Sequence, residues 1–126
     1  MITALHALVY AEDVEAARTF FRDVLRLPFA DTGGGWLIFK SGPSELAVHP
    51  AHWEWQGRRG GTDQQFNLSL ACDDLAATMA ELTERGARFV GEITEQQWGT
   101  TVELEVPGAG TMTLYQPKYD LPALSL

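Results

Sequence analysis

An internal repeat constrains this chain more than any other feature, because one pattern of strand, helix and further strands occurs twice. Alternating apolar and polar residues open the first copy at residues 5–10 and the second copy near Phe66. An acidic pair that suits a helix N-cap follows each of these segments. Asp13 and Asp74 are 61 residues apart, as are His6 and Asn67. The sequence therefore predicts two modules in register.

Each copy continues with a helix and three strands. Val14, Ala17, Phe21 and Val24 have helical spacing, and Pro28 marks the end of that helix. The second helix places Leu75, Met79 and Leu82 on its inner side and ends at Gly86. The expected later strands are 28–32, 35–40 and 44–49 in the first copy, and 88–94, 100–106 and 111–116 in the second. These elements predict an α+β fold of two βαβββ modules that form curved mixed sheets.

The 126 residues are expected to form a single domain, 1–126. Module 1 spans about 1–50, a connecting loop about 51–65, module 2 about 66–117, and a tail 118–126. A four-stranded sheet with one helix leaves its other face open, so two modules side by side can form a cup. Long connections are often lids or binding loops, which makes the connecting loop a candidate functional segment.

Composition excludes several classes of protein. The net charge of −8 would repel phosphate backbones, so no nucleic-acid partner is expected. The sequence has no apolar run long enough for a membrane span and no basic segment typical of a signal peptide. Cys72 is the only cysteine, which excludes an internal disulfide, and its place in the strand predicts a core position. We expect a cytoplasmic protein without membrane contacts.

Two segments carry a family resemblance. Residues 6–25, which include His6-Ala-Leu-Val-Tyr-Ala-Glu-Asp13, resemble the opening of vicinal oxygen chelate proteins. The tail from Pro107 to Pro117 resembles the closing strand of that superfamily, with an altered turn. The superfamily includes glyoxalases, bleomycin-resistance proteins and extradiol dioxygenases. The resemblance implies the two-module fold and a homodimer. It does not fix function, since the superfamily includes metal lyases, dioxygenases, isomerases and metal-free drug-binding proteins.

The resemblance maps the superfamily's metal positions onto His6, Glu45, Asn67 and Thr113. Strand alternation independently directs these four side chains to the concave side. Only His6 and Glu45 are strong ligands for a transition metal, which usually needs at least three from the protein. We therefore expect no metal cofactor. The alternative is a divalent metal (Zn, Ni, Fe or Mn) held by His6 and Glu45 with help from His49, Glu103 or Glu105.

Aromatic residues indicate a binding pocket, since planar rings stack on planar or cationic ligands. Two of the four tryptophans lie in the connecting loop. The alternative is that these rings pack a dimer interface or plug the cup. The candidate ligand-binding residues are His6, Tyr10, Trp36, His49, Trp53, Trp55, Asn67, Trp98, Glu103, Thr113 and Tyr115.

The favoured function is a small-molecule-binding protein similar to the bleomycin-resistance proteins. It would sequester a planar or cationic natural product in an aromatic-lined cup and so serve antibiotic resistance. The alternative is an enzyme, a metal-dependent lyase or dioxygenase that acts on vicinal oxygens through a reduced or remodelled metal site. A third hypothesis is an interaction module whose cup is filled by its own aromatic residues. No catalytic residue is assigned.

Overall fold

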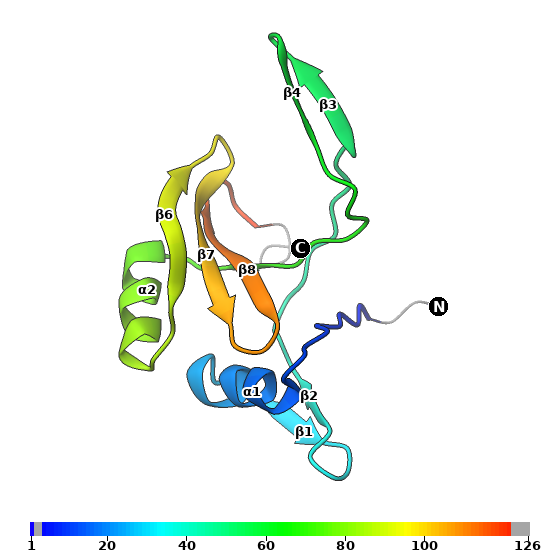
Figure 1. Cartoon of the computed structure of the whole chain (residues 1–126), viewed down its shortest axis with the longest axis vertical. Coiled ribbons are helices and arrows are strands. Elements are labelled where there is room, and N and C mark those ends of the chain that lie inside the picture. The colour runs from blue at the N-terminus through cyan, green and yellow to red at the C-terminus, as the bar shows by residue number, and fades with distance from the viewer. Residues whose placement is uncertain (2–3, 122–126) are drawn as a thin grey trace.

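The second half of the chain forms the complete module that the repeat predicts (Figure 1). The structure is a computed structural model and describes residues 1 and 4–121. The elements of this half are β5 (Ser69–Ala71), α2 (Leu75–Glu84), β6 (Phe89–Glu95), β7 (Gly99–Val106) and β8 (Gly110–Pro117). They form a four-stranded sheet in the order β5-β8-β7-β6, in which β5 runs parallel to β8 and the other neighbours are antiparallel. A break in the β6–β7 register between Val90 and Thr94 helps to curve this sheet.

One face of the sheet holds the core. Val102, Leu104 and Val106 alternate along β7 and are at most 2% exposed. They form the inward face of this strand, and Leu114 of β8 lies opposite Val102 in the register. Helices from both halves of the chain pack on this cluster. Its buried members are Ala17, Phe20, Leu75, Leu82, Ala87, Val102, Leu104, Val106 and Leu114.

The predicted helix ends are confirmed. The carboxylates of Asp13 and Asp74 accept hydrogen bonds from the backbone N–H groups of Ala16 and Ala77, each at 3.0 Å. These bonds satisfy donors that the first helical turn leaves open. Gly86 follows the last residues of α2 with a φ of +91°, the left-handed conformation that ends many helices.

The first helix changes its winding halfway. The α-helix α1 (Val14–Thr19) continues as a π-helix, η1 (Phe20–Val24), in which the N–H of Leu25 donates to the carbonyl of Phe20 at 3.1 Å. Phe20 is buried in the core, whereas Phe21 packs near Phe39, with ring centroids 5.7 Å apart. Val14, the first residue of the predicted apolar stripe, stays 44% exposed at the start of α1.

A short hairpin follows η1. Strand β1 (Phe29–Asp31) pairs antiparallel with β2 (Leu37–Phe39), as predicted for residues 28–32 and 35–40. Three glycines with positive φ make the turn, and the Asp31 carboxylate accepts hydrogen bonds from the N–H groups of Gly33 and Gly35. This hairpin forms its own two-stranded sheet beside α1 (Figure 1).

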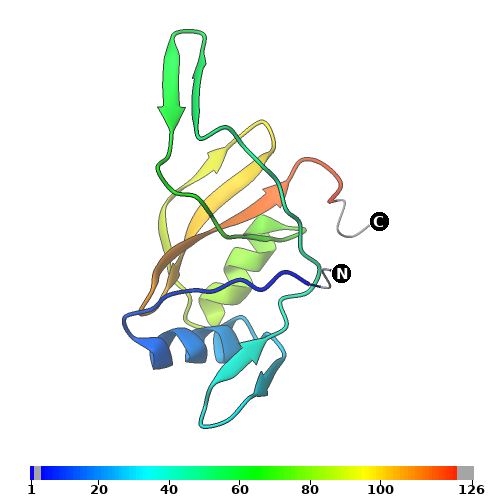
Figure 2. The ribbon, with the colours of Figure 1, turned by 90° about the vertical axis from the view of Figure 1, so that its right-hand side faces the viewer.

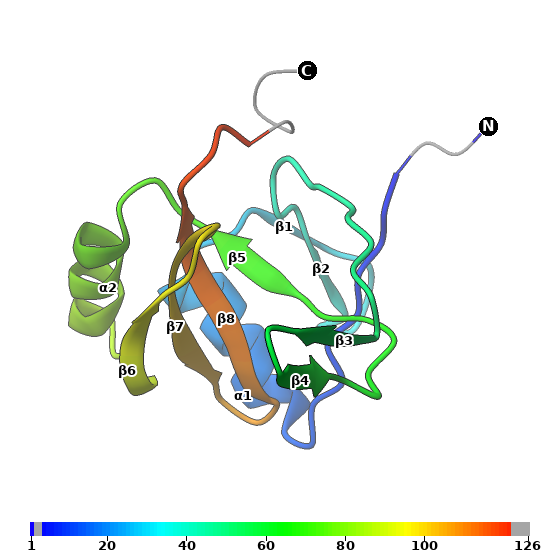
Figure 3. The same ribbon diagram turned by 90° about the horizontal axis from the view of Figure 1, so that it is seen from above.

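Two predicted strands of the first module are not strands here. Residues 5–10 and 44–49 run without ladder partners along the side of the sheet that faces away from α2 (Figures 1 and 3). Their apolar residues stay exposed, among them Leu5 and Leu8 at 59%, Leu46 at 81% and Val48 at 93%. A strand pattern becomes a strand only when a neighbour accepts and donates its backbone hydrogen bonds. This chain leaves both segments without that neighbour.

The connecting segment, expected to be a loop, contains a second hairpin. Strand β3 (His52–Trp55) pairs with β4 (Arg58–Gly61), and Trp53 and Trp55 therefore lie on a strand and not in a loop. Gln56 and Gly57 have φ values of 48° and 75°, which is the two-residue turn that tight hairpins prefer. The hairpin projects beyond the rest of the molecule (Figure 2).

Two contacts tie the first helix to the second module. The carbonyl of Gly108, in the β7–β8 turn, accepts hydrogen bonds from the N–H groups of Glu12 and Asp13 at 2.8 and 3.2 Å. At the other end, the Arg85 guanidinium donates to the carbonyl of Val24 at 2.9 Å. The helix is thus held at its start and at its end.

No helix among residues 4–121 has the length and apolar character needed to cross a bilayer.

Gly108→Ala should destabilise the protein, because Gly108 has a φ of +79° and an added Cβ would collide with the backbone oxygen of Asp13. We expect a loss of about 2 to 4 kcal/mol in the free energy of unfolding, measured by urea denaturation. Gly110→Ala is the matched control, since Gly110 also has a positive φ but open space around it. Equal losses in the two variants would contradict the proposed contact.

Candidate functional site

The open face of the β7–β8 pair carries polar and aromatic side chains. Because strand side chains alternate, the residues between the core positions point away from the helices. Glu103 lies opposite Thr113 in the register, and the Thr113 hydroxyl donates to the Glu103 carboxylate at 2.7 Å. The pair is partly buried. Glu103, Thr113 and Tyr115 therefore share one face of the strand pair.

Tyr115 is the centre of an aromatic cluster on this face. Its ring lies 5.4 Å from that of Trp98 at an interplanar angle of 73°, an edge-to-face arrangement. Its hydroxyl is 3.5 Å from the hydroxyl of Tyr119. We call Trp98, Glu103, Thr113, Tyr115 and Tyr119 the open-face cluster.

The phenol of Tyr115 is kept protonated. Burial raises the pKa of Tyr115 most, followed by the contact with Tyr119 and the negative charge of Glu45. The charge of Glu45 thus acts on the phenol of Tyr115 from a distant part of the sequence. A neutral Tyr115 offers a hydroxyl donor to a bound molecule at ordinary pH.

Backbone and ionic contacts fix Trp98 over the sheet. The N–H of Lys118 donates to the Trp98 carbonyl at 2.9 Å, and the Lys118 ammonium donates to the Gln96 carbonyl at 2.8 Å. The same ammonium pairs with the Glu95 carboxylate at 2.7 Å. Hydrogen bonds from Lys118 and Thr100 lower the pKa of Glu95. These contacts join the β6–β7 turn to the end of β8, so the indole sits on a braced loop.

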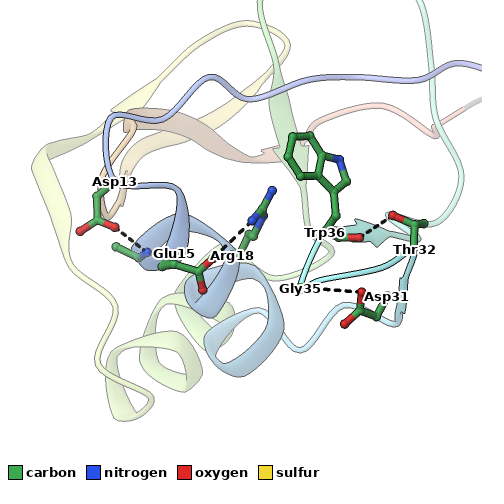
Figure 4. A network of polar contacts seen from close by, with 8 residues as sticks. Asp13, Glu15, Arg18, Asp31, Thr32, Gly35 and Trp36 are labelled. Atoms are coloured by element: carbon green, nitrogen blue, oxygen red, sulfur yellow. Dashed lines mark hydrogen bonds and ion pairs between the residues drawn. The ribbon is translucent and has the colours of Figure 1, made fainter.

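The other predicted aromatic residues lie elsewhere. Trp36 stacks against Arg18, whose guanidinium carbon is 4.9 Å from the ring centroid (Figure 4). That contact is at the β1–β2 end of the molecule, far from the β6–β7 turn that carries Trp98 (Figure 1). Trp53 and Trp55 belong to the projecting hairpin. These three rings therefore do not join the open-face cluster within one chain.

Tyr10 lies at a shallow hollow of about 600 Å³ beside the β7–β8 turn. Glu12, Asp13 and Glu105 also line this hollow, which makes it acidic. Asp13 is already engaged as the N-cap of α1. The hollow adds negative charge at one end of the open face.

The superfamily's expected metal positions do not form a metal site within one described chain. His6, His49 and Asn67 are exposed and lie outside the strands. Across the described residues, 1 and 4–121, no three His, Cys, Asp or Glu side chains lie close enough to hold a metal ion. Thr113 is engaged with Glu103, and an alcohol is a weak ligand. The donor set of a single chain therefore does not fit a catalytic transition metal.

A family model described as the Glyoxalase/Bleomycin resistance protein/Dioxygenase superfamily matches residues 3–108. The chain belongs to this superfamily. The match agrees with the α+β fold and the curved sheet that the sequence predicted. Membership defines the architecture, and activities within one fold differ.

Similar proteins support the same fold. The uncharacterized protein YetH of Bacillus subtilis (strain 168) is 23% identical over 104 residues, which cover 77% of this chain and 83% of that protein. The integron cassette protein VPC_CASS1 from V. Pseudocholerae has a TM-score of 0.57 at 14% identity, covering 95% of this chain and 100% of its own. TnmS3, an antibiotic binding protein from Streptomyces sp. CB03234, has a TM-score of 0.52 at 20% identity, covering 93% and 100%.

Sequence reasoning missed Tyr119. The residue lies in the tail that was set apart after Pro117, yet positions 115, 117 and 119 share a parity. Continuing the alternation past the proline would have placed both tyrosines on one face. Nothing in the local sequence indicates that Lys118 braces Trp98, because that contact depends on how two turns meet.

The alkaline stability of the protein should depend on Tyr115. Its pKa is raised in the folded chain, so the unfolded chain releases the phenol proton first as pH rises. The contribution is therefore intact below the ordinary pKa of about 10 and is lost as pH rises through and above it. Tyr115→Phe should flatten the alkaline decline of stability, measured by urea denaturation at several pH values.

Glu45→Gln tests the neighbourhood of Tyr115 directly. Removing that negative charge should lower the pKa of Tyr115, read from the phenolate absorbance against Tyr115→Phe as a blank. An unchanged titration would mean that Glu45 does not approach the cluster in solution.

Proposed function

We propose that this protein binds a planar or cationic small molecule, of the natural-product antibiotic class, on the open face of its sheet. The observation that carries the proposal is the open-face cluster, where a braced tryptophan and a neutral tyrosine lie beside a partly buried carboxylate. Ligand sites usually combine aromatic walls with a few polar anchors.

Each group has a defined role in this proposal. The indole of Trp98 and the ring of Tyr115 offer flat surfaces that stack on planar or cationic groups. Glu103 attracts positive charge and orients it, since Thr113 holds its carboxylate. The acidic hollow beside Tyr10 strengthens the attraction of a cation. The antibiotic-binding relative TnmS3 adds support by analogy of fold alone.

We further propose a cytoplasmic homodimer. Supporting the dimer, several large apolar side chains on the unpaired segments 5–10 and 44–49 stay in solvent, which is unusual for a protein that acts as a monomer. Supporting the reducing location, Cys72 is a free thiol whose pKa burial raises.

A metal is not required by this mechanism. The alternative, a metal-dependent lyase or dioxygenase, needs His6 and Glu45 to meet a third ligand, for which His49, Glu103 and Glu105 remain the candidates. Elemental analysis of untagged protein, before and after incubation with Zn, Ni, Mn or Fe(II), should find less than stoichiometric metal. Near-stoichiometric metal that is lost in His6→Ala would favour the enzyme.

Trp98→Ala should weaken ligand binding by at least about tenfold, the loss expected for one aromatic stacking contact together with its buried area. Isothermal titration calorimetry with a panel of planar and cationic antibiotics measures this. Trp36→Ala is the matched control, since Trp36 packs on Arg18 away from the cluster. If no compound in a broad panel binds the wild-type protein, the proposal fails.

A further inference from the structure

The place of the Trp98 ring depends on the turn that carries it, between β6 and β7. Trp98 is 46% exposed and lies outside the buried core, and its ring meets that of Tyr115 edge-on. A single edge-to-face contact is weak compared with the freedom of an exposed turn. Contacts that hold the backbone of the turn must therefore decide where the indole lies.

Lys118, directly after β8, holds this turn from outside. Its ammonium donates to the Gln96 carbonyl at 2.8 Å and pairs with the Glu95 carboxylate at 2.7 Å, so one charged group binds two successive residues. Its backbone N–H donates to the Trp98 carbonyl at 2.9 Å. Lys118 thus contacts the turn both before the indole-bearing residue and at that residue.

The partner of this ammonium is itself fixed. The Thr100 hydroxyl lies 3.1 Å from both oxygens of the Glu95 carboxylate and donates to it. Hydrogen bonds from Lys118 and Thr100 lower the pKa of Glu95, so this carboxylate is ionised at neutral pH. Because Glu95 neutralises the ammonium, the contact does not oppose the binding of a cation nearby.

The backbones of the turn and of β8 also meet closely. Gly99 is buried and lies opposite Pro117 at the end of the β7–β8 ladder. A Cβ on Gly99 would lie 2.8 Å from the carbonyl oxygen of Gln116. The ladder is therefore closed at this end, and the Lys118 side chain has to hold only the few residues beyond it.

Exposure separates positioning from stability. The side chains of Lys118 and Glu95 are 44% and 66% exposed. Ion pairs in such places contribute little to the free energy of unfolding, because water screens the charges and two flexible side chains lose entropy. The core lies on the opposite face of the sheet, where β7 buries Val102 and Leu104. Loss of the Lys118 side chain should therefore release the turn and leave the fold intact.

We propose that Lys118 is a positioning residue for ligand binding, whose ammonium keeps the Trp98 indole against Tyr115 by holding Glu95 and Gln96. Lys118 acts through the turn and does not need to touch the ligand. The indole keeps part of its surface in solvent, where a planar molecule can stack on it. The ligand half of this proposal rests on the function proposed above, whereas the position of the ring does not.

Fluorescence of Trp98 tests its position without any ligand. Trp36, Trp53 and Trp55 are changed to phenylalanine, which leaves Trp98 as the only tryptophan of the full chain. In this background, Lys118→Met should at least about double the fast, nanosecond part of the anisotropy decay, because the turn is released. Lys118→Arg keeps a charged donor and should restore most of the original decay.

Lys40→Met is the matched control, since it removes the same charge from an exposed position directly after β2. This variant should leave the Trp98 decay unchanged. Urea denaturation of each variant should give a midpoint within about 0.3 M of the parent protein, the small effect expected for an exposed ion pair.

Calorimetric titration with ethidium, a planar cation, and with the antibiotic panel tests the consequence for binding. Lys118→Met should weaken binding by at least about threefold, and by less than Trp98→Ala does, because the ring is displaced and not removed. When residue 98 is already alanine, Lys118→Met should cause no further loss, since both residues act through one contact.

Three results would overturn the role of Lys118: an unchanged Trp98 decay in Lys118→Met, a large fall in its urea midpoint, or a full further loss of binding in the Trp98→Ala background. The two proposals fail separately. If the decay changes as expected but neither ethidium nor any antibiotic binds the wild-type protein, the proposed function fails while the position of the ring stands. If a compound binds equally well with and without the Lys118 side chain, the positioning role fails while the function stands.

Discussion

The rest of the structure depends on the alternation of side chains along the β7–β8 hairpin. Its inward residues, Val102, Leu104, Val106 and Leu114, hold the helices of both halves, and its outward residues form the open-face cluster. A slip of one residue in this register would bury Glu103 and expose Leu104. The interior and the candidate site are therefore two sides of one ladder, and neither can change register alone.

Sequence patterns predicted the second module almost completely. The helix caps at Asp13 and Asp74, the ending at Gly86 and the parity of β7 and β8 rest on local rules, because each is decided by residues close in sequence. Of the candidate site, the shared face of Glu103, Thr113 and Tyr115 followed from the same parity. The effect of the Glu45 charge on the pKa of Tyr115 and the Lys118 brace both depend on how distant segments of the chain come together.

The first module shows where such reasoning fails. Residues 5–10 have as clear an alternating pattern as β5, yet only β5 has a partner, since β8 lies parallel to it. Alternation predicts which side chains of a segment face the core, but it does not identify the strand that will pair with that segment. Conversely, Gln56-Gly57 lacks the usual asparagine or aspartate of tight turns, so the sequence predicts a loop where the structure has the β3–β4 hairpin.

Cys72, the single thiol of the chain, lies where local opening of the sheet would change its accessibility. The Cys72 side chain packs against the core, and its S–H lies 3.5 Å from the carbonyl of Tyr115, at the end of the β5–β8 pair. Burial raises its pKa and keeps it in the unreactive protonated form. Modification by a thiol reagent should speed up when β5 parts from β8, so its rate responds to local openings of the strand that borders the open-face cluster. The rate of Cys72 modification is therefore a measure of local opening at the β5–β8 edge of the sheet.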